Sequence, residues 1–166
     1  MIYLIAQCIG FVAFIISLTT YHKRTKSSIL KNSLMVNFLK LIHYILLDAY
    51  SGFFVKIMAI IRDLFVMLKE KYKVLNNNIL FFIFIIVYIL IAIISYENLI
   101  SLLPILAAVT YMFVLWYKEE IKIKKVALFG YFCWLIYNFY ILSIPGVLSN
   151  IVSIISVSIA INKSYK

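Results

Sequence analysis

Long apolar stretches follow one another along almost the entire sequence, separated only by short charged or polar segments. Seven stretches can be drawn, at residues 2–20, 32–49, 52–69, 77–95, 99–117, 124–141 and 144–162. A helix needs about 20 mostly apolar residues to cross the hydrocarbon core of a bilayer. We therefore predict an all-α membrane protein with seven transmembrane helices.

The composition indicates that lipid is the solvent of this chain. Only 13% of the residues are charged and 66% are hydrophobic, whereas a soluble domain usually has about 25% charged residues. The net charge of +10 comes from basic residues clustered between the apolar stretches. This pattern is typical of cytoplasmic loops beside anionic lipid. We expect a lipid bilayer as partner and no nucleic acid.

The basic residues alternate between loops, and this predicts the direction of each helix. Lys and Arg occur in the first, third and fifth connections and at the C-terminal end, and the other three connections have none. The basic residues concerned are Lys23, Arg24, Lys26, Lys31, Lys69, Lys71, Lys73, Lys118, Lys122, Lys124, Lys125, Lys163 and Lys166. The positive-inside rule then places the N-terminus outside and the C-terminus in the cytoplasm.

The sequence also contains a weak internal repeat. A shift of 94 residues aligns the first three predicted helices with the last three without a gap. Identical pairs are Ala13 and Ala107, Leu34 and Leu128, Phe38 and Phe132, Leu41-Ile42 and Leu135-Ile136, Gly52 and Gly146, and Ile57 and Ile151.

The predicted organisation is a repeat over 1–70, a linker helix over 71–98 and a second repeat over 99–166. The single linker helix gives both three-helix repeats the same orientation, in a 3+1+3 plan. Parallel repeats of this kind occur in SWEET transporters, in which substrates bind near the bilayer midplane between the repeats.

Several short motifs resemble the YgjV family of bacterial inner-membrane proteins, over nearly the whole chain. They are Gln7-Cys-Ile-Gly10-Phe-Val-Ala13-Phe14, Thr19-Thr20, His43-Tyr44 with Tyr50, Ile61-Arg62, Leu102-Leu103-Pro104, Cys133-Trp134 with Tyr137-Asn138, and Ser143-Ile-Pro-Gly146. That family resembles the SWEET, SemiSWEET and PQ-loop transporters. The resemblance implies a multi-pass protein of the bacterial inner membrane.

The resemblance to SemiSWEET proteins implies a solute pocket that contains Trp134 and Asn150. A Trp face can stack on a sugar ring, and an Asn amide can bond hydroxyl groups. The alternative is structural, with Trp134 at the membrane interface and Asn150 bridging helices. The same positions in the first repeat hold Lys40 and Lys56. If both face the pocket, they favour an anionic solute.

Four further residues are candidates for the pocket or for its gating. His43 lies one turn from Lys40, where it could couple transport to protons or simply bond a neighbouring helix. Tyr44 and Asn138 correspond to each other in the repeat and are expected in the same pocket. Pro104 is a gating candidate. It departs from the Pro-Gln motif of the sugar transporters, because it lies earlier in its helix, opposite Gly10 in the repeat.

Arg62 and Asp63 are the remaining candidates, with a structural or gating role. Since they are adjacent, we expect them on different faces of their helix. Arg62 should then pair with a carboxylate or carbonyl of a neighbouring helix, and Asp63 with Lys40 or with loop charges.

These features favour a transporter of a small polar solute, such as a sugar, a sugar acid or another small anion, that works by alternating access. The alternative is a non-transporting scaffold or sensor whose polar residues only hold helices together. An enzyme is not expected, because the sequence has no His-Glu-x-x-His or Gly-x-Ser-x-Gly motif. No cofactor or metal is expected, and the sequence is compatible with a homo-oligomer.

Overall fold

The computed structural model describes residues 1–19, 26–72, 78–117 and 120–164, and these residues are almost entirely helical, with no β-strand among them. The prediction of an all-α chain with seven long helices is confirmed. The helices are α1 (Ile2–Thr19), α2 (Lys26–Ile45), α3 (Tyr50–Lys71), α4 (Asn78–Ile94), α5 (Leu103–Tyr117), α6 (Glu120–Tyr140) and α7 (Ile144–Ser164), with a short 3₁₀ helix, η3 (Leu99–Leu102), before α5.

Two helices begin four or more residues before the apolar stretches that predicted them. The structure starts α2 at Lys26 and α6 at Glu120, whereas the apolar stretches begin at residues 32 and 124. Hydropathy marks the part of a helix that can lie in hydrocarbon, but the backbone hydrogen bonds continue into the polar headgroup region. Long Lys side chains are tolerated there because they reach towards water. Lys23, Arg24, Lys73, Lys118 and Lys166 lie outside the described residues.

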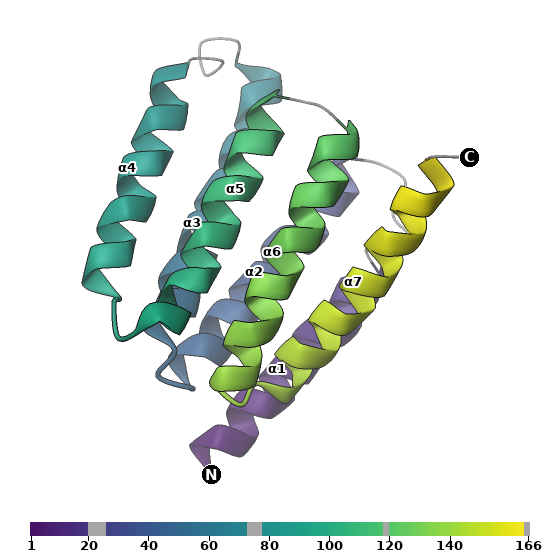
Figure 1. Ribbon diagram of the computed structural model, residues 1–166. Helices are drawn as coiled ribbons and strands as arrows, with labels where there is room; N and C mark the ends of the chain where they lie inside the picture. Colours follow the sequence, from purple (N-terminus) through teal and green to yellow (C-terminus); the bar gives the residue numbers. More distant parts are fainter. Residues whose placement is uncertain (20–25, 73–77, 118–119, 165–166) are drawn as a thin grey trace.

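The helices form two layers, with α4 to α7 in one and α1 to α3 in the other (Figure 1). Contacts join α1 to α2, α2 to α3, α3 to α5, α5 to α6, α6 to α7 and α7 back to α1, so six helices form a closed ring. The seventh, α4, packs outside this ring against α3 and α5. The two termini lie at opposite ends of the bundle (Figure 1).

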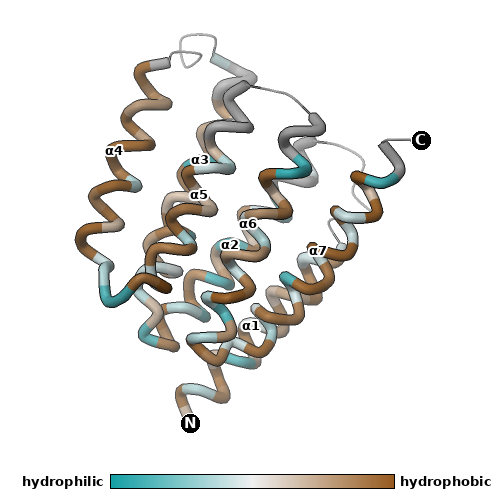
Figure 2. The backbone as a smooth tube through the Cα atoms, in the orientation of Figure 1, coloured by the Kyte–Doolittle hydropathy of each residue, from teal (hydrophilic) through white to brown (hydrophobic). Residues whose placement is uncertain are grey.

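Small residues allow close packing inside the bundle, and large apolar residues face outwards. Ala6 and Ala13 of α1 are fully buried, whereas Ile86 and Ile93 of α4 are exposed. Figure 2 shows that apolar residues follow α4 along most of its length. By length and hydropathy, Ile2–Thr19 and Ile144–Asn162 could each cross a membrane, and Ile79–Ile94 and Leu99–Met112 are shorter apolar helices. This outward-facing apolar surface is what a lipid environment requires.

The turns after α2 and α6 have the same backbone geometry. Each contains one residue in the left-handed region, Asp48 and Leu142, both with φ of 54°. The amide of Ala49 donates to the carbonyl of Tyr44 at 3.0 Å, and the amide of Ser143 donates to the carbonyl of Asn138 at 2.8 Å. Both turns are Schellman motifs, which satisfy the free carbonyls at a helix C-terminus. They place the starts of α3 and α7 beside the ends of α2 and α6.

Candidate functional site

A cavity of about 220 Å³ lies among α2, α3, α5 and α6 and is bordered by one residue of α4. Its walls combine two cations, several aromatic rings and small residues. The lining residues are Ser33, Asn37, Val55, Lys56, Ala59, Arg62, Tyr88, Ala107, Ala108, Tyr111, Val126, Ala127, Gly130, Tyr131 and Trp134. The cavity therefore spans the junction between the first three helices and the last three.

Small side chains on three helices provide the space for this cavity. Ala59 lies on α3, Ala107 and Ala108 on α5, and Ala127 and Gly130 on α6. A Cβ atom added at Gly130 would meet only the Cβ of Ala107, at 3.7 Å, and the Ala107 carbonyl, at 4.0 Å. Larger apolar residues at these positions would close the space between α3, α5 and α6.

Lys56 and Trp134, two of the predicted pocket residues, are in direct contact in this cavity. The Lys56 Nζ atom lies 4.0 Å from the centroid of the Trp134 ring, which is a cation–π interaction worth about 2 kcal/mol when it is shielded from water. Tyr44 stacks on the Trp134 ring with 5.6 Å between centroids, and Tyr137 meets that ring edge-on at 5.9 Å. The aromatic neighbours thus fix the position of Trp134.

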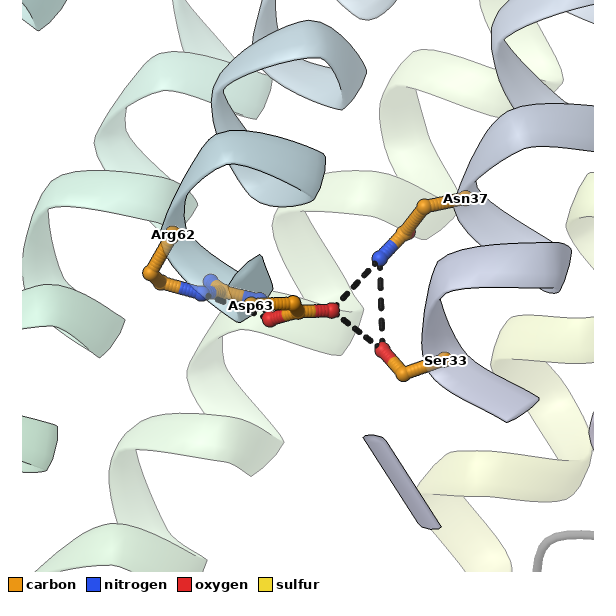
Figure 3. Close-up of polar contacts among 4 residues, drawn as sticks. All are labelled: Ser33, Asn37, Arg62 and Asp63. Carbon is orange, nitrogen blue, oxygen red and sulfur yellow. Dashed lines mark hydrogen bonds and ion pairs between the residues drawn. The ribbon is translucent and has the colours of Figure 1, made fainter. Parts of the chain in front are cut away.

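Arg62 and Asp63 pair with each other, so the prediction that each would pair elsewhere was wrong (Figure 3). Nη2 and Nε of Arg62 lie 2.9 and 3.1 Å from Oδ1 of Asp63. Helix geometry sets the direction in which each side chain leaves the backbone, and the prediction assumed that the ends of both side chains follow that direction. The Arg side chain is long enough to turn back along its own helix to the neighbouring carboxylate.

The second Asp63 oxygen joins α3 to α2. Its Oδ2 atom accepts hydrogen bonds from Ser33 Oγ at 2.6 Å and from Asn37 Nδ2 at 3.1 Å. Figure 3 shows these two residues of α2 reaching across to the carboxylate. Asp63 is buried, and its charge is therefore balanced by Arg62 and solvated by two side chains of α2. The Arg62 guanidinium also lies 5.2 Å from the Tyr111 ring centroid.

Lys40 contacts α7 and is not among the residues that line the cavity. Its Nζ atom lies 3.4 Å from Ser149 Oγ, next to Asn150 in the sequence. Asn150 is buried and, like Lys40, is not among the lining residues. The structure therefore brings Lys40 to α7, as it brings Lys56 to α6.

Tyr44 and Asn138 bond each other rather than lining the cavity. The Tyr44 hydroxyl donates to Asn138 Oδ1 at 3.0 Å, and both residues are buried. Close by, the amide of Gly52 at the start of α3 donates to the Tyr137 hydroxyl at 3.0 Å. These bonds join α2 to α6 and α6 to α3 at the end of the bundle where the N-terminus lies.

His43 is part of a chain of hydrogen bonds at the same end. Its Nδ1 atom lies 2.7 Å from the Ala6 carbonyl, and its Nε2 atom lies 2.7 Å from Ser143 Oγ. Since a carbonyl can only accept, Nδ1 carries a proton. Ser143 Oγ in turn accepts from the amide of Gly146 at 3.2 Å. This arrangement fits the bonding role for His43, one of the two roles that the sequence left open.

Pro104 and Gln7 also lie at this end of the bundle. Pro104 is fully buried in the first turn of α5, where a missing amide hydrogen costs nothing. The Gln7 amide bonds the turn between α6 and α7 twice, to the Leu142 carbonyl at 3.0 Å and from the Ile144 amide at 3.1 Å. Side chains from α1, α2 and α6 therefore hold this end closed.

Comparison with known proteins places the chain in a family. The family described as "Bacterial inner membrane protein" (Imp-YgjV) matches residues 4–166. The chain belongs to the YgjV family. It is 26% identical over 144 residues to inner membrane protein YgjV of Escherichia coli (strain K12), an alignment covering 87% of this chain and 75% of that relative. No solved structure matches. The protein is accordingly a bacterial inner membrane protein.

Tyr88, Ser33 and Tyr111 are among the cavity residues of this YgjV-family chain that were not predicted from its sequence. Tyr88 is the only polar residue between Ile79 and Ile94, and that isolation was a usable signal. Ser33 lies one turn before Asn37 and continues a polar stripe through Lys40 and Tyr44. The third, Tyr111, has no comparable signal in its apolar surroundings.

Proposed function

We propose that this protein is a transporter that carries a small polar solute across the inner membrane by alternating access. The solute would be a sugar, a sugar acid or another small anion. The observation that carries the proposal is the cavity lined by Lys56, Arg62 and Trp134 between the first three helices and the last three. Cationic side chains are costly within a bilayer and are usually retained where they line a solute pathway or pair with one another.

The 3+1+3 repeat is part of this proposal, and matched geometry supports it. The left-handed residues Asp48 and Leu142 are separated by the shift of 94 residues, as are Gly52 and Gly146. In the ring of six helices, the contact between α3 and α5 corresponds to the contact between α7 and α1, and α4 lies outside the ring. Both relationships are expected for two parallel repeats about an axis along the membrane normal.

The proposed orientation places the N-terminus outside and the C-terminus in the cytoplasm. The described turns at the N-terminal end, 46–49, 95–98 and 141–143, contain no Lys or Arg. Lys31 near the start of α2, Lys71 at the end of α3 and Lys125 near the start of α6 belong to the opposite end. The positive-inside rule assigns that basic end to the cytoplasm.

In this orientation we infer a state that is closed to the outside. The hydrogen bonds of Tyr44, Tyr137 and His43 join the helices at the outer end. The cavity lies further inwards, and its residues on α6 run from Trp134 to Val126, next to the basic residue Lys125. Transport would require the outer hydrogen bonds to open and the inner half of the cavity to close.

The scaffold alternative predicts a different interior. A protein that only needs stable helix packing gains from closing the junction between α3, α5 and α6, because van der Waals contact between closely packed helices holds a membrane bundle together. The small residues Ala59, Ala108 and Gly130 instead leave a cavity there. This difference favours transport over a purely structural role.

Solute flux in proteoliposomes tests the proposal. Purified protein would be reconstituted, and uptake of labelled glucose, glucuronate, glycerol and lactate would be compared with protein-free vesicles. We expect saturable uptake of at least one solute, reduced about tenfold or more by Trp134→Ala and less by Trp134→Phe. Phe132→Ala is the matched control, because Phe132 is an exposed residue of the same helix. Uptake equal to that of protein-free vesicles for every solute would contradict the proposal.

A further inference from the structure

A residue in the wall of the cavity has a buried hydroxyl without a hydrogen-bond partner among the described residues. Tyr88 of α4 is fully buried and lines the cavity, and its Oη atom bonds to nothing among the described residues. A buried hydroxyl without a partner loses its hydrogen bonds to water and gains none in return, which is costly. Such groups are rare in native proteins, and they often mark a place where a ligand or an ion binds.

The same cavity contains a cation without a carboxylate partner. Within the part of the chain that the structure describes, no ion pair is formed by Lys56, whose contact is with the Trp134 ring. The other cation, Arg62, is already neutralised by Asp63 at 2.9 Å. Among the residues that line the cavity, Lys56 is therefore the cation that no described carboxylate balances.

The size of the cavity limits what can occupy it. An apolar cavity of about 150 Å³ accommodates benzene, so by proportion about 220 Å³ holds a molecule of roughly nine non-hydrogen atoms. A monosaccharide such as glucose already exceeds this size, so the volume favours the smallest of the proposed solutes. The Trp134 ring and the small residues Ala108 and Ala127 offer apolar contact opposite the polar groups.

We propose that the cavity is a binding site for a small organic monocarboxylate, bound by the Lys56 ammonium and the Tyr88 hydroxyl. Both groups donate hydrogen bonds, and a carboxylate accepts several. The single unbalanced cation of the cavity lining matches a monoanion, whereas a phosphate monoester would bring a second negative charge that no other unpaired cation of the lining balances. This assignment rests on the proposed transport function, for which it names the substrate class.

Paired probes that differ only in charge test this assignment. Binding of lactate and lactamide, and of benzoate and benzamide, would be measured calorimetrically on the full-length protein in nanodiscs of phosphatidylcholine, a lipid without net charge. We expect each acid to bind at least about tenfold more tightly than its amide. Lys56→Met should abolish this preference, Lys56→Arg should retain it, and Tyr88→Phe should weaken acid binding about tenfold.

The results that would overturn the monocarboxylate site differ from those that would overturn the transport proposal. Equal binding of acid and amide, an acid preference that persists in Lys56→Met, or no binding of either acid would overturn the monocarboxylate site. Binding of phosphatidylglycerol that displaces both acids would assign the cavity to a lipid headgroup and overturn it as well. Glucose flux without acid binding would leave transport standing. Acid binding without any solute flux would support this site and reject transport.

Discussion

The hydroxyl of Tyr44 donates a 3.0 Å hydrogen bond to Oδ1 of Asn138, the residue 94 positions further along the chain. Under the proposed repeat these two residues are equivalent. Equivalent residues of two repeats can touch only where they lie close to the axis that relates them. Under this repeat, the Tyr44–Asn138 bond marks the point where the two halves meet, at the end of the bundle where the N-terminus lies.

Removal of the Tyr44 hydroxyl should destabilise the closed junction. In Tyr44→Phe the buried Asn138 side chain loses its partner, and we expect unfolding to become easier by about 0.6 to 1.7 kcal/mol, the range for hydrogen bonds between membrane helices. Reversible unfolding in mixed micelles measures this difference. Tyr50→Phe is the control, because Tyr50 is exposed. Equal stability of the two variants would show that the bond contributes nothing.

Gly146 should tolerate no side chain. A Cβ atom at this position would lie 2.5 Å from Cγ of Asn138 and from Oγ of Ser143. We expect Gly146→Ala to destabilise the protein by about 1–3 kcal/mol, the usual cost of overpacking. Gly130→Ala is the matched control on α6, where the nearest atom would lie at 3.7 Å. Thermal unfolding of both variants in the same detergent checks the difference, and comparable losses would argue against the close approach.

The Arg62–Asp63 pair should depend on both charges together. Asp63→Asn leaves the buried guanidinium without its carboxylate, a change that typically costs about 3–5 kcal/mol. Arg62→Met combined with Asp63→Asn removes both charges and should recover a large part of that loss. Thermal stability and yield of the two variants measure the effect. A double variant at least as unstable as Asp63→Asn alone would contradict mutual neutralisation.

The helices were predictable because a bilayer imposes a simple pattern on sequence. Each spanning segment has to be apolar over about 20 residues, and the seven stretches in the sequence all became helices. The starts of α2 and α6 were not predictable from hydropathy. Lys26 and Glu120 precede the apolar stretches, at helix ends where polar residues are tolerated, so hydropathy does not mark them as helical.

The candidate site was predicted less completely than the helices. Lys56 and Trp134 were expected together and are in contact. The Arg62–Asp63 pair was missed because sequence spacing gives the direction in which a side chain leaves the helix, but not how far a long side chain bends. Tyr88 was missed because the packing of α4 against α3 and α5 depends on side-chain shape at both surfaces.

The most direct test of alternating access is whether one cavity residue can be reached from both faces of the membrane. Ala127→Cys, on a background of Cys8→Ser and Cys133→Ser, would be reconstituted in sealed vesicles and exposed to a membrane-impermeant maleimide from either side. Alternating access predicts labelling from the basic face at once, and slower labelling from the other face that Tyr137→Phe accelerates, because this change removes the bond to Gly52. Phe132→Cys should resist labelling from both faces. Labelling of Ala127→Cys from a single face under every condition, or from neither face, would contradict alternating access.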